Sequence, residues 1–412
     1  MLALLAGSVL ATQVSTAASK TPEPASETQR AVFVGNNWDG TADVLHFQPP
    51  SGSKPGGFTR IARMNIIPDI NERMAEILAD PVRLGYFLAI RELIGEGHDQ
   101  WVDDMYSTND GRLLIVSRPS LADVVAISFD TGQIVWRFRV HGQRSDHMGL
   151  SPDGTRVAVS ASTGNVVHIL DTATGQEVGR FPSGDSPHEN TYSSDGSRIF
   201  HASIGLVYTP LDQPAVDTTK GERYFQVVDA TTNQIISRVD MGQKLAEAGY
   251  PDMSSAVRPM ALSPDEHFVY LQVSFFHGFV EYDLVNQRVT RVAELPNLVP
   301  DMPREQYLLD SAHHGIAMNG VGTKLCVAGT MSDYAAIVNR QSFGYKLLQL
   351  GEKPYWVTDS DGGDYCFISW SGTDAVSALS YAKGSEVARI QVGDHPQRIR
   401  NGNVRTDWVD AQ

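Results

Sequence analysis

The sequence has 412 residues, of which 42% are hydrophobic, and its formal net charge is −15. This composition supplies enough apolar side chains for a large core. Nucleic-acid binding requires a basic surface, and the chain contains no run of Lys or Arg, so we expect no nucleic acid among its partners.

The chain begins with an apolar stretch (2–11) that is followed by small residues up to Ala18. This order is typical of the hydrophobic region and cleavage zone of a signal peptide, although the usual positive residues at the start are missing. We predict a signal peptide over 1–18, a linker over 19–30 and export to the periplasm or the extracellular space. The alternative is an extension without a targeting role. The apolar run is too short to span a membrane, so we expect no membrane insertion.

A pattern of strands and turns recurs six times in the rest of the chain. Each copy begins with a tight turn such as Ser151-Pro152-Asp153-Gly154, and a second turn follows two β-rich segments later. A repeat of about 40–50 residues indicates radially arranged blades, and each copy holds four short strands. Three strands near the N-terminus and GDHPQRIRNG near the C-terminus complete a seventh blade that closes the ring. We therefore predict an all-β fold, a seven-bladed β-propeller over 31–406.

Two of the copies, SPDGTRVAVSASTGNVVHILDTATGQEVGRF and SDGGDYCFISWSGTDAVSALSYAKGSEVARIQVG, resemble the YVTN or YncE-like propeller repeats of exported bacterial proteins. The similarity extends over about residues 30–405. It implies the propeller fold, but it leaves the function open, because this family includes binding proteins, quinoprotein-associated subunits and enzymes.

Four long insertions are expected to project from one face of the propeller. Three connect the last strand of one blade to the first strand of the next (67–99, 242–256 and 295–312), and 204–222 connects the second and third strands of a blade. Within the first of them, the sequence predicts two helices over about 69–94, with a capping box that begins at Asp69. We expect this helical insertion to form a lid over the channel mouth, and packing decoration is the alternative. The loop-rich face is also where a protein partner would bind.

The only two cysteines, Cys326 and Cys366, occupy equivalent strands of consecutive repeats. We expect the two cysteines to be small side chains in the core, and a disulfide between them is the alternative in an exported protein.

Histidines recur just upstream of the first turn in several copies. We predict that His147, His188, His314 and His395 converge at the channel mouth as ligands of a transition metal, Cu, Fe or Zn. The pattern is irregular, since one blade doubles the histidine and two blades lack it, which favours a dedicated site. In the alternative, the histidines are architectural, as in WD-repeat propellers.

Catalytic roles are assigned to four further residues near these positions: Arg258, Tyr355, His98 and His313. Arg258 would anchor a carboxylate of the substrate, and Tyr355 would contribute to an aromatic wall.

The first functional hypothesis is a metal-dependent oxidoreductase or oxygenase that acts on a small organic substrate. The second is a metal-independent lyase, isomerase or lactonase-like hydrolase that uses a histidine as general base. The third is a non-catalytic propeller that binds a protein or a small ligand.

Overall fold

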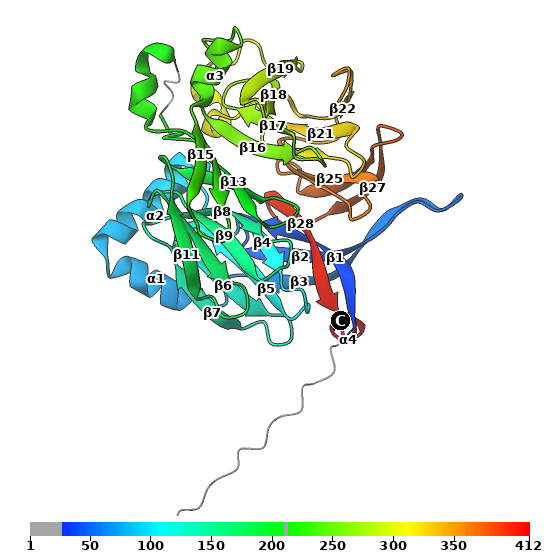
Figure 1. Cartoon of the computed structure of the whole chain (residues 1–412). Coiled ribbons are helices and arrows are strands. Elements are labelled where there is room, and N and C mark those ends of the chain that lie inside the picture. The colour runs from blue at the N-terminus through cyan, green and yellow to red at the C-terminus, as the bar shows by residue number, and fades with distance from the viewer. Residues whose placement is uncertain (1–26, 210–212) are drawn as a thin grey trace, which may run out of the picture.

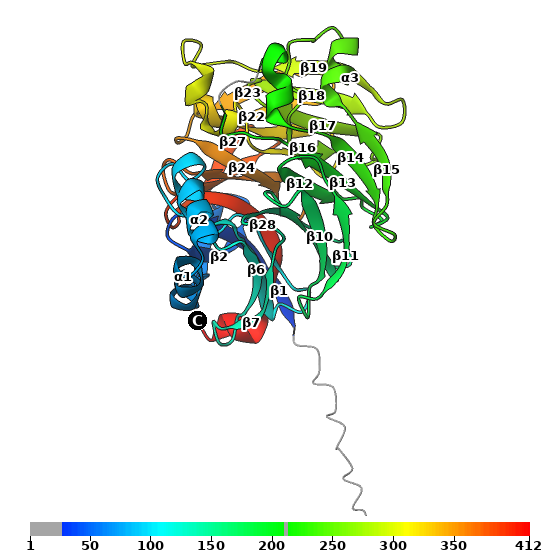
Figure 2. The same ribbon diagram turned by 90° about the vertical axis from the view of Figure 1, so that its left-hand side faces the viewer.

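The structure is a computed structural model that describes residues 27–209 and 213–412. Its strands form seven four-stranded antiparallel sheets around one axis, which confirms the predicted seven-bladed β-propeller (Figures 1 and 2). The predicted signal peptide and residues 19–26 of the predicted linker lie outside the described residues. The first strand begins at Thr28, within the segment expected to be a linker.

The ring is closed by the two ends of the chain, as the sequence predicts. Strand β28 (Pro396–Arg405) is the innermost strand of blade 1 and pairs with β1 (Thr28–Asn36). The blade continues outward with β2 (Thr41–Gln48) and β3 (Gly57–Asn65). Because β28 and β1 pair along most of their lengths, neither end leaves an open sheet edge inside the ring.

The other six blades follow in chain order, each starting with the strand nearest the axis. Blades 2 to 4 contain β4 (Met105–Ser107), β5 (Leu113–Arg118), β6 (Asp123–Ser128), β7 (Ile134–Arg139), β8 (Ser145–Leu150), β9 (Arg156–Ala161), β10 (Val166–Asp171), β11 (Glu177–Pro182), β12 (Pro187–Tyr192), β13 (Arg198–Ser203), β14 (Phe225–Asp229) and β15 (Ile235–Val239). Blades 5 to 7 contain β16 (Val257–Leu262), β17 (Phe268–Val273), β18 (Gly278–Asp283), β19 (Arg288–Glu294), β20 (Ile316–Met318), β21 (Lys324–Gly329), β22 (Tyr334–Asn339), β23 (Tyr345–Leu348), β24 (Pro354–Asp359), β25 (Tyr365–Trp370), β26 (Ala375–Ser380) and β27 (Ser385–Gln391).

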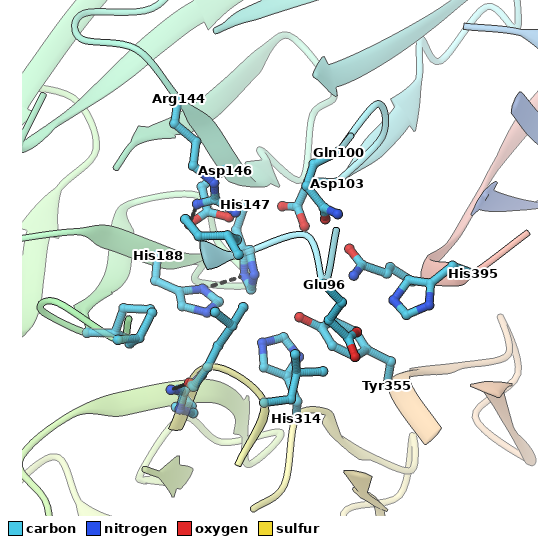
Figure 3. A pocket seen from close by; sticks show the side chains of 17 residues that line it. Glu96, Gln100, Asp103, Arg144, Asp146, His147, His188, His314, Tyr355 and His395 are labelled. Atoms are coloured by element: carbon cyan, nitrogen blue, oxygen red, sulfur yellow. Dashed lines mark hydrogen bonds and ion pairs between the residues drawn. The ribbon is translucent and has the colours of Figure 1, made fainter. Parts of the chain in front are cut away.

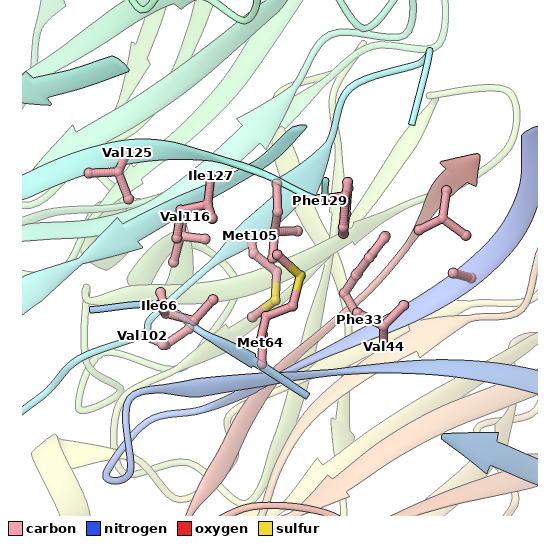
Figure 4. Close-up of a cluster of buried hydrophobic side chains, with 14 of the residues drawn as sticks. Phe33, Val44, Met64, Ile66, Val102, Met105, Val116, Val125, Ile127 and Phe129 are labelled. Carbon is pink, nitrogen blue, oxygen red and sulfur yellow. The ribbon is translucent and has the colours of Figure 1, made fainter. Parts of the chain in front are cut away.

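The hydrophobic core lies in the seams between neighbouring blades. Each of the seven seams has its own cluster of buried apolar side chains. In the seam between blades 1 and 2, for example, Phe33, Met64, Met105 and Phe129 pack together (Figure 4). Because the apolar residues of each sheet face its neighbours, the axis of the ring is free to carry polar side chains.

The predicted helical insertion forms α1 (Ile70–Leu78) and α2 (Pro81–Leu93), which lie beside blade 2 (Figure 2). The segment that follows α2 leads to the channel mouth, where Ile94 and Glu96 line a pocket. Two short helices, α3 (Met241–Glu247) and α4 (Thr406–Asp410), lie in another insertion and at the C-terminal end. The remaining helices are short 3-10 segments: η1 (Pro119–Leu121), η2 (Pro214–Lys220), η3 (Arg304–Gln306), η4 (Leu308–Asp310) and η5 (Thr330–Ser332). No helix in the described part of the chain is long and apolar enough to cross a membrane.

The predicted capping box at Asp69 is wrong. The Asp69 side chain makes no capping hydrogen bond to α1. Instead, the buried guanidinium of Arg118 donates to both of its carboxylate oxygens, at 2.6 and 3.2 Å. A charge-assisted pair with a buried Arg is stronger than a hydrogen bond to a helix N–H, so the carboxylate turns toward the blade.

Cys326 and Cys366 form a disulfide that joins blades 6 and 7, so the alternative left open by the sequence is the one observed. Both cysteines are fully buried in the seam between these blades, with a Cα–Cα distance of 6.4 Å.

We expect the double variant Cys326→Ala/Cys366→Ala to lose about 4 kcal/mol of unfolding free energy, because the bond closes a loop of 40 residues. Urea unfolding of the wild type and the variant measures this difference. Unfolding of the wild type in the presence of reductant is the matched control and should move to the variant's midpoint. A loss below about 1 kcal/mol would contradict a stabilising role.

Candidate metal centre

The residues at the channel mouth come from one equivalent position in every blade. The first strands of blades 3, 4, 5 and 7 each carry a β-bulge near their start, and so does β28 in blade 1. A bulge re-aims side chains and is common next to functional sites. In each blade, the residue two positions before the first regularly paired residue of the innermost strand points into one shared pocket. We call these seven residues the ring: Asp103, Asp146, His188, Arg258, His314, Tyr355 and Gln397.

The next residue along each strand forms a second layer beneath this ring. The second layer contains Asp104, His147, Glu189, Pro259, Gly315, Trp356 and Arg398. Its polar members are buried, and His147 contacts both Glu189 and Arg398, so these three side chains support the ring from below. The pocket above has a volume of about 40 Å³, and loop residues from three of the four insertions complete its wall (Figure 3). This volume accommodates an ion and only a few further atoms.

Three of the predicted ligands meet in this pocket. Nitrogen atoms of His147, His188 and His314 lie within 4.8 Å of one another, and all three side chains are buried (Figure 3). The Nδ1 atoms of His147 and His188 are 2.9 Å apart. Two nitrogens that each lie about 2.0–2.1 Å from one ion are separated by no more than about 4.2 Å, so this pair fits a shared ion.

The protonation of the three imidazoles also suits a metal. Burial holds the pKa of His147, of His188 and of His314 well below the ordinary value, so the rings are neutral at neutral pH. Neutral imidazole is the form that binds transition metals. The buried Nδ1 of His314 has no hydrogen-bond partner among the described residues. Such a buried acceptor is costly unless a ligand satisfies it.

His147 is held from both sides by Glu189 and Arg398 of the second layer. Its Nδ1 lies 2.7 Å from Glu189 Oε2, and its Nε2 contacts Arg398 Nη2. A guanidinium can only donate, so Nε2 accepts and the ring proton is on Nδ1, shared with Glu189. His147 can therefore join His188 and His314 as a ligand only if it changes tautomer and Arg398 withdraws. Arg398 Nη2 also lies 3.3 Å from Asp103 Oδ1, which gives the guanidinium an alternative partner.

The other predicted site residues are distributed around this group. Arg258 belongs to the ring, where its Nε donates to Ser274 at 3.0 Å. Tyr355 also belongs to the ring, and its phenol ring lies 4.2 Å from the His314 imidazole, centroid to centroid. Burial raises the pKa of Tyr355 to about 12, so the phenol keeps its proton.

The structure does not bring His395, His98 or His313 into the group of three. His395 lies two residues before Gln397, the ring member of blade 1. Its imidazole stacks on one face of the Trp38 indole, and the His98 imidazole stacks on the other face. His313 precedes the ring position by one residue, so its side chain turns into blade 6, where Nε2 is 3.0 Å from the Tyr334 hydroxyl. A shift of one residue along a strand reverses the side-chain direction, which explains why neighbouring histidines separate.

Sequence reasoning did not find Asp103 and Gln397 of the ring or Arg398 beneath it. They are not histidines, and the turns used to align the repeats leave the register uncertain by one residue. The first regular strand residue of each blade, such as Met105, Met148 or Ile399, is a better anchor. Counting back two residues from these positions reaches every member of the ring.

Buried histidines outside the ring make the fold sensitive to acid. His201 is fully buried, and burial lowers its pKa to about 3. In the unfolded chain a histidine takes up its proton near pH 6.5, whereas the folded protein resists it down to about pH 3. Folding stability is therefore fully present above about pH 6.5 and falls as the pH decreases below that value.

We expect His201→Gln to remove about 2 kcal/mol of the stability loss that the wild type shows between pH 7 and pH 5. Urea unfolding at pH 7, 6 and 5 measures the slope for both proteins. The exposed His141, replaced by Gln, serves as the control and should leave the slope unchanged. Equal slopes for His201→Gln and the wild type would contradict the prediction.

Comparisons with known proteins were made for the whole chain. A scan against known protein families and a search of curated proteins found no match, so the YVTN or YncE-like assignment stays a prediction. Among solved structures, the chain is similar to hydrazine synthase from Kuenenia stuttgartiensis, with 16% identity and a TM-score of 0.54. The match covers 72% of this chain and 88% of the other. At this identity the similarity supports the fold alone, and the chain is a seven-bladed β-propeller with a histidine group that could hold a metal.

Proposed function

We propose that this protein is an exported, metal-dependent enzyme of the oxidoreductase or oxygenase type that acts on a small organic substrate at the channel mouth. The observation that carries the proposal is the group formed by His147, His188 and His314, whose nitrogen atoms lie within 4.8 Å of one another in a buried pocket. Buried imidazoles from three different blades that face one point are unusual unless they share a ligand.

In this proposal the three histidines hold a Cu, Fe or Zn ion, which when bound supplies a Lewis-acidic and, for Cu or Fe, a redox-active centre. Arg258 orients an anionic group of the substrate, because its guanidinium is fixed in the ring by Ser274 and the Leu309 carbonyl. Tyr355 keeps its proton, so its hydroxyl is available to donate a hydrogen bond to the substrate. The small cavity excludes bulk water from the ion and admits only a small part of the substrate.

The localisation, the family and the partner are also part of the proposal. The apolar N-terminal segment of the sequence and the Cys326–Cys366 disulfide support export, because structural disulfides persist in oxidising compartments. The repeat motifs support a YVTN or YncE-like origin. The insertions on the pocket side support a protein partner on that face.

Metal analysis of the purified full-length protein tests the proposal. After incubation with Cu, Fe or Zn salts and removal of the excess, we expect about one ion per chain with an N-donor spectroscopic signature for copper. A protein that retains no stoichiometric ion under these conditions would contradict the proposal.

A second function is favoured by one specific contact, the 2.7 Å pair between His147 Nδ1 and Glu189 Oε2. A histidine oriented by a carboxylate is the usual arrangement of a general base. In this alternative, Arg398 withdraws from Nε2, and His147 abstracts a proton with that nitrogen in a metal-independent lyase, isomerase or lactonase-like hydrolase. A metal-free protein that keeps its full activity, and loses it on Glu189→Gln, would favour this alternative over the first.

A further inference from the structure

Two histidines outside the metal group take part in an aromatic stack. The Trp38 indole lies between the imidazoles of His98 and His395, with centroid distances of 3.9 and 3.8 Å and interplanar angles of 12° and 6°. His98 is exposed to solvent, Trp38 is half-buried, and His395 is buried at the pocket wall. The stack therefore runs from the surface of the protein to the candidate metal pocket.

The aromatic contacts continue from this stack to a candidate ligand. The ring of Tyr355 lies 6.4 Å from His395 and 4.2 Å from His314, centroid to centroid. Figure 3 shows His395, Tyr355 and His314 one after another along the edge of the pocket. Five aromatic rings thus connect solvent to a nitrogen donor of the site.

The main chain fixes the position of this stack. The Asn37 N–H donates to the His395 carbonyl at 3.1 Å, and the His395 N–H donates to Asp374 Oδ1 at 2.9 Å. His395 adopts a left-handed conformation with φ of 53°. Ser186 and Lys353 do the same at the equivalent positions of blades 4 and 7, so this turn belongs to the repeat. Trp38 and the two histidines that enclose it are specific to the junction of blades 1 and 2.

The pocket itself is too small for an electron carrier. Its volume of about 40 Å³ admits an ion and small ligands, whereas a carrier protein or a bulky complex must stay at the surface. Electrons that enter or leave a buried ion must then cross protein. Tunnelling falls steeply with the width of saturated gaps, and stacked π systems keep those gaps narrow.

We propose that His98, Trp38, His395 and Tyr355 form an electron path between a one-electron carrier at the surface and a Cu or Fe ion held by the group of His147, His188 and His314. This inference rests on the proposed function. In the oxidative direction the ion loses one electron, the carrier gains it, and no proton or covalent bond changes. The rings conduct the electron without being chemically altered.

The test uses the full-length protein loaded with copper and reduced by ascorbate. The reduced protein is mixed with hexacyanoferrate(III), which is too large for the pocket, and oxidation of copper is followed by stopped-flow absorbance. We expect Trp38→Leu and His98→Ala to slow this oxidation by roughly tenfold or more, with the copper content unchanged. Trp136→Leu is the matched control, because Trp136 is a buried tryptophan in the outermost strand of blade 2.

Hydrogen peroxide is small enough to enter the pocket and should oxidise the copper at the same rate in all variants. This arm separates a broken path from a damaged ion site. Because the His98 side chain is exposed, His98→Ala should leave the fold intact, so a slower oxidation in this variant cannot be attributed to misfolding. Oxidation by hexacyanoferrate(III) at the wild-type rate in both variants would overturn the path. If the wild-type protein holds no copper, the metal analysis already shows this, and both the proposed function and the electron path are contradicted.

Discussion

Replacement of either His188 or His314 by Ala is expected to weaken transition-metal binding by more than about 100-fold. Loss of a residue that merely orients a ligand costs about 10–100-fold in affinity, and removal of the ligand itself costs more. Both side chains are ring members that face the pocket, and neither is held by an ion pair in the way that His147 is. Competition with a chromophoric chelator at constant pH measures the affinity.

His201→Gln is the matched control for these variants. His201 is as deeply buried as the two ring histidines and lies in the adjacent strand of blade 4, but its Nε2 is 2.8 Å from Ser183 Oγ, away from the pocket. We expect it to leave the affinity unchanged. If His188→Ala and His314→Ala bind metal as tightly as the control, the three-histidine group is not the metal site.

Replacement of Arg118 by Ala is expected to lower the free energy of unfolding by about 3–5 kcal/mol. Arg118 is fully buried and donates to Asp123 at 2.8 Å twice and to both oxygens of Asp69. Removing the guanidinium leaves the fully buried Asp123 with the half-buried Arg137 as its one ion-pair partner among the described residues. The same change frees the start of α1, so the helical insertion should also exchange its amide hydrogens faster.

The exposed ion pair between Arg30 and Asp361 gives the comparison. Their side chains are 52% and 45% exposed, and pairs of this kind contribute less than about 1 kcal/mol. Urea unfolding of Arg118→Ala and Arg30→Ala, with hydrogen exchange of residues 70–93, distinguishes the two cases. Equal losses of stability would show that burial of Arg118 has no energetic consequence.

The fold could be predicted because its signals are local. Each blade repeats the same turn residues and β-rich segments. The segment GDHPQRIRNG has no further strands after it in the sequence to complete a blade, so its partners had to be the strands near the N-terminus, and this predicted ring closure by β28. The capping box at Asp69 failed for the opposite reason, because Arg118 lies 49 positions along the chain and competes for the carboxylate.

The site was predicted only in part because its geometry depends on single-residue register. His147, His188 and His314 were chosen for their distance from a turn, and bulges of one residue decide which side chains face the axis. His395 lies two residues from the ring position, which Gln397 occupies instead. A search for histidines could not find Arg398, although Arg398 contacts His147 and determines which ring nitrogen carries the proton.

Closure of the ring by the last strand also sets the order in which the site can form. Gln397 of the ring, Arg398 beneath it and His395 of the stack all belong to the last 18 residues of the 412-residue chain. Their partners, His147 and Trp38, are synthesised hundreds of residues earlier. A chain synthesised only as far as β27 thus has no complete pocket. Under the proposed function, an ion would be bound only after residues 395–398 have joined the earlier blades, so the compartment in which β28 pairs would also determine which ions are available to the site.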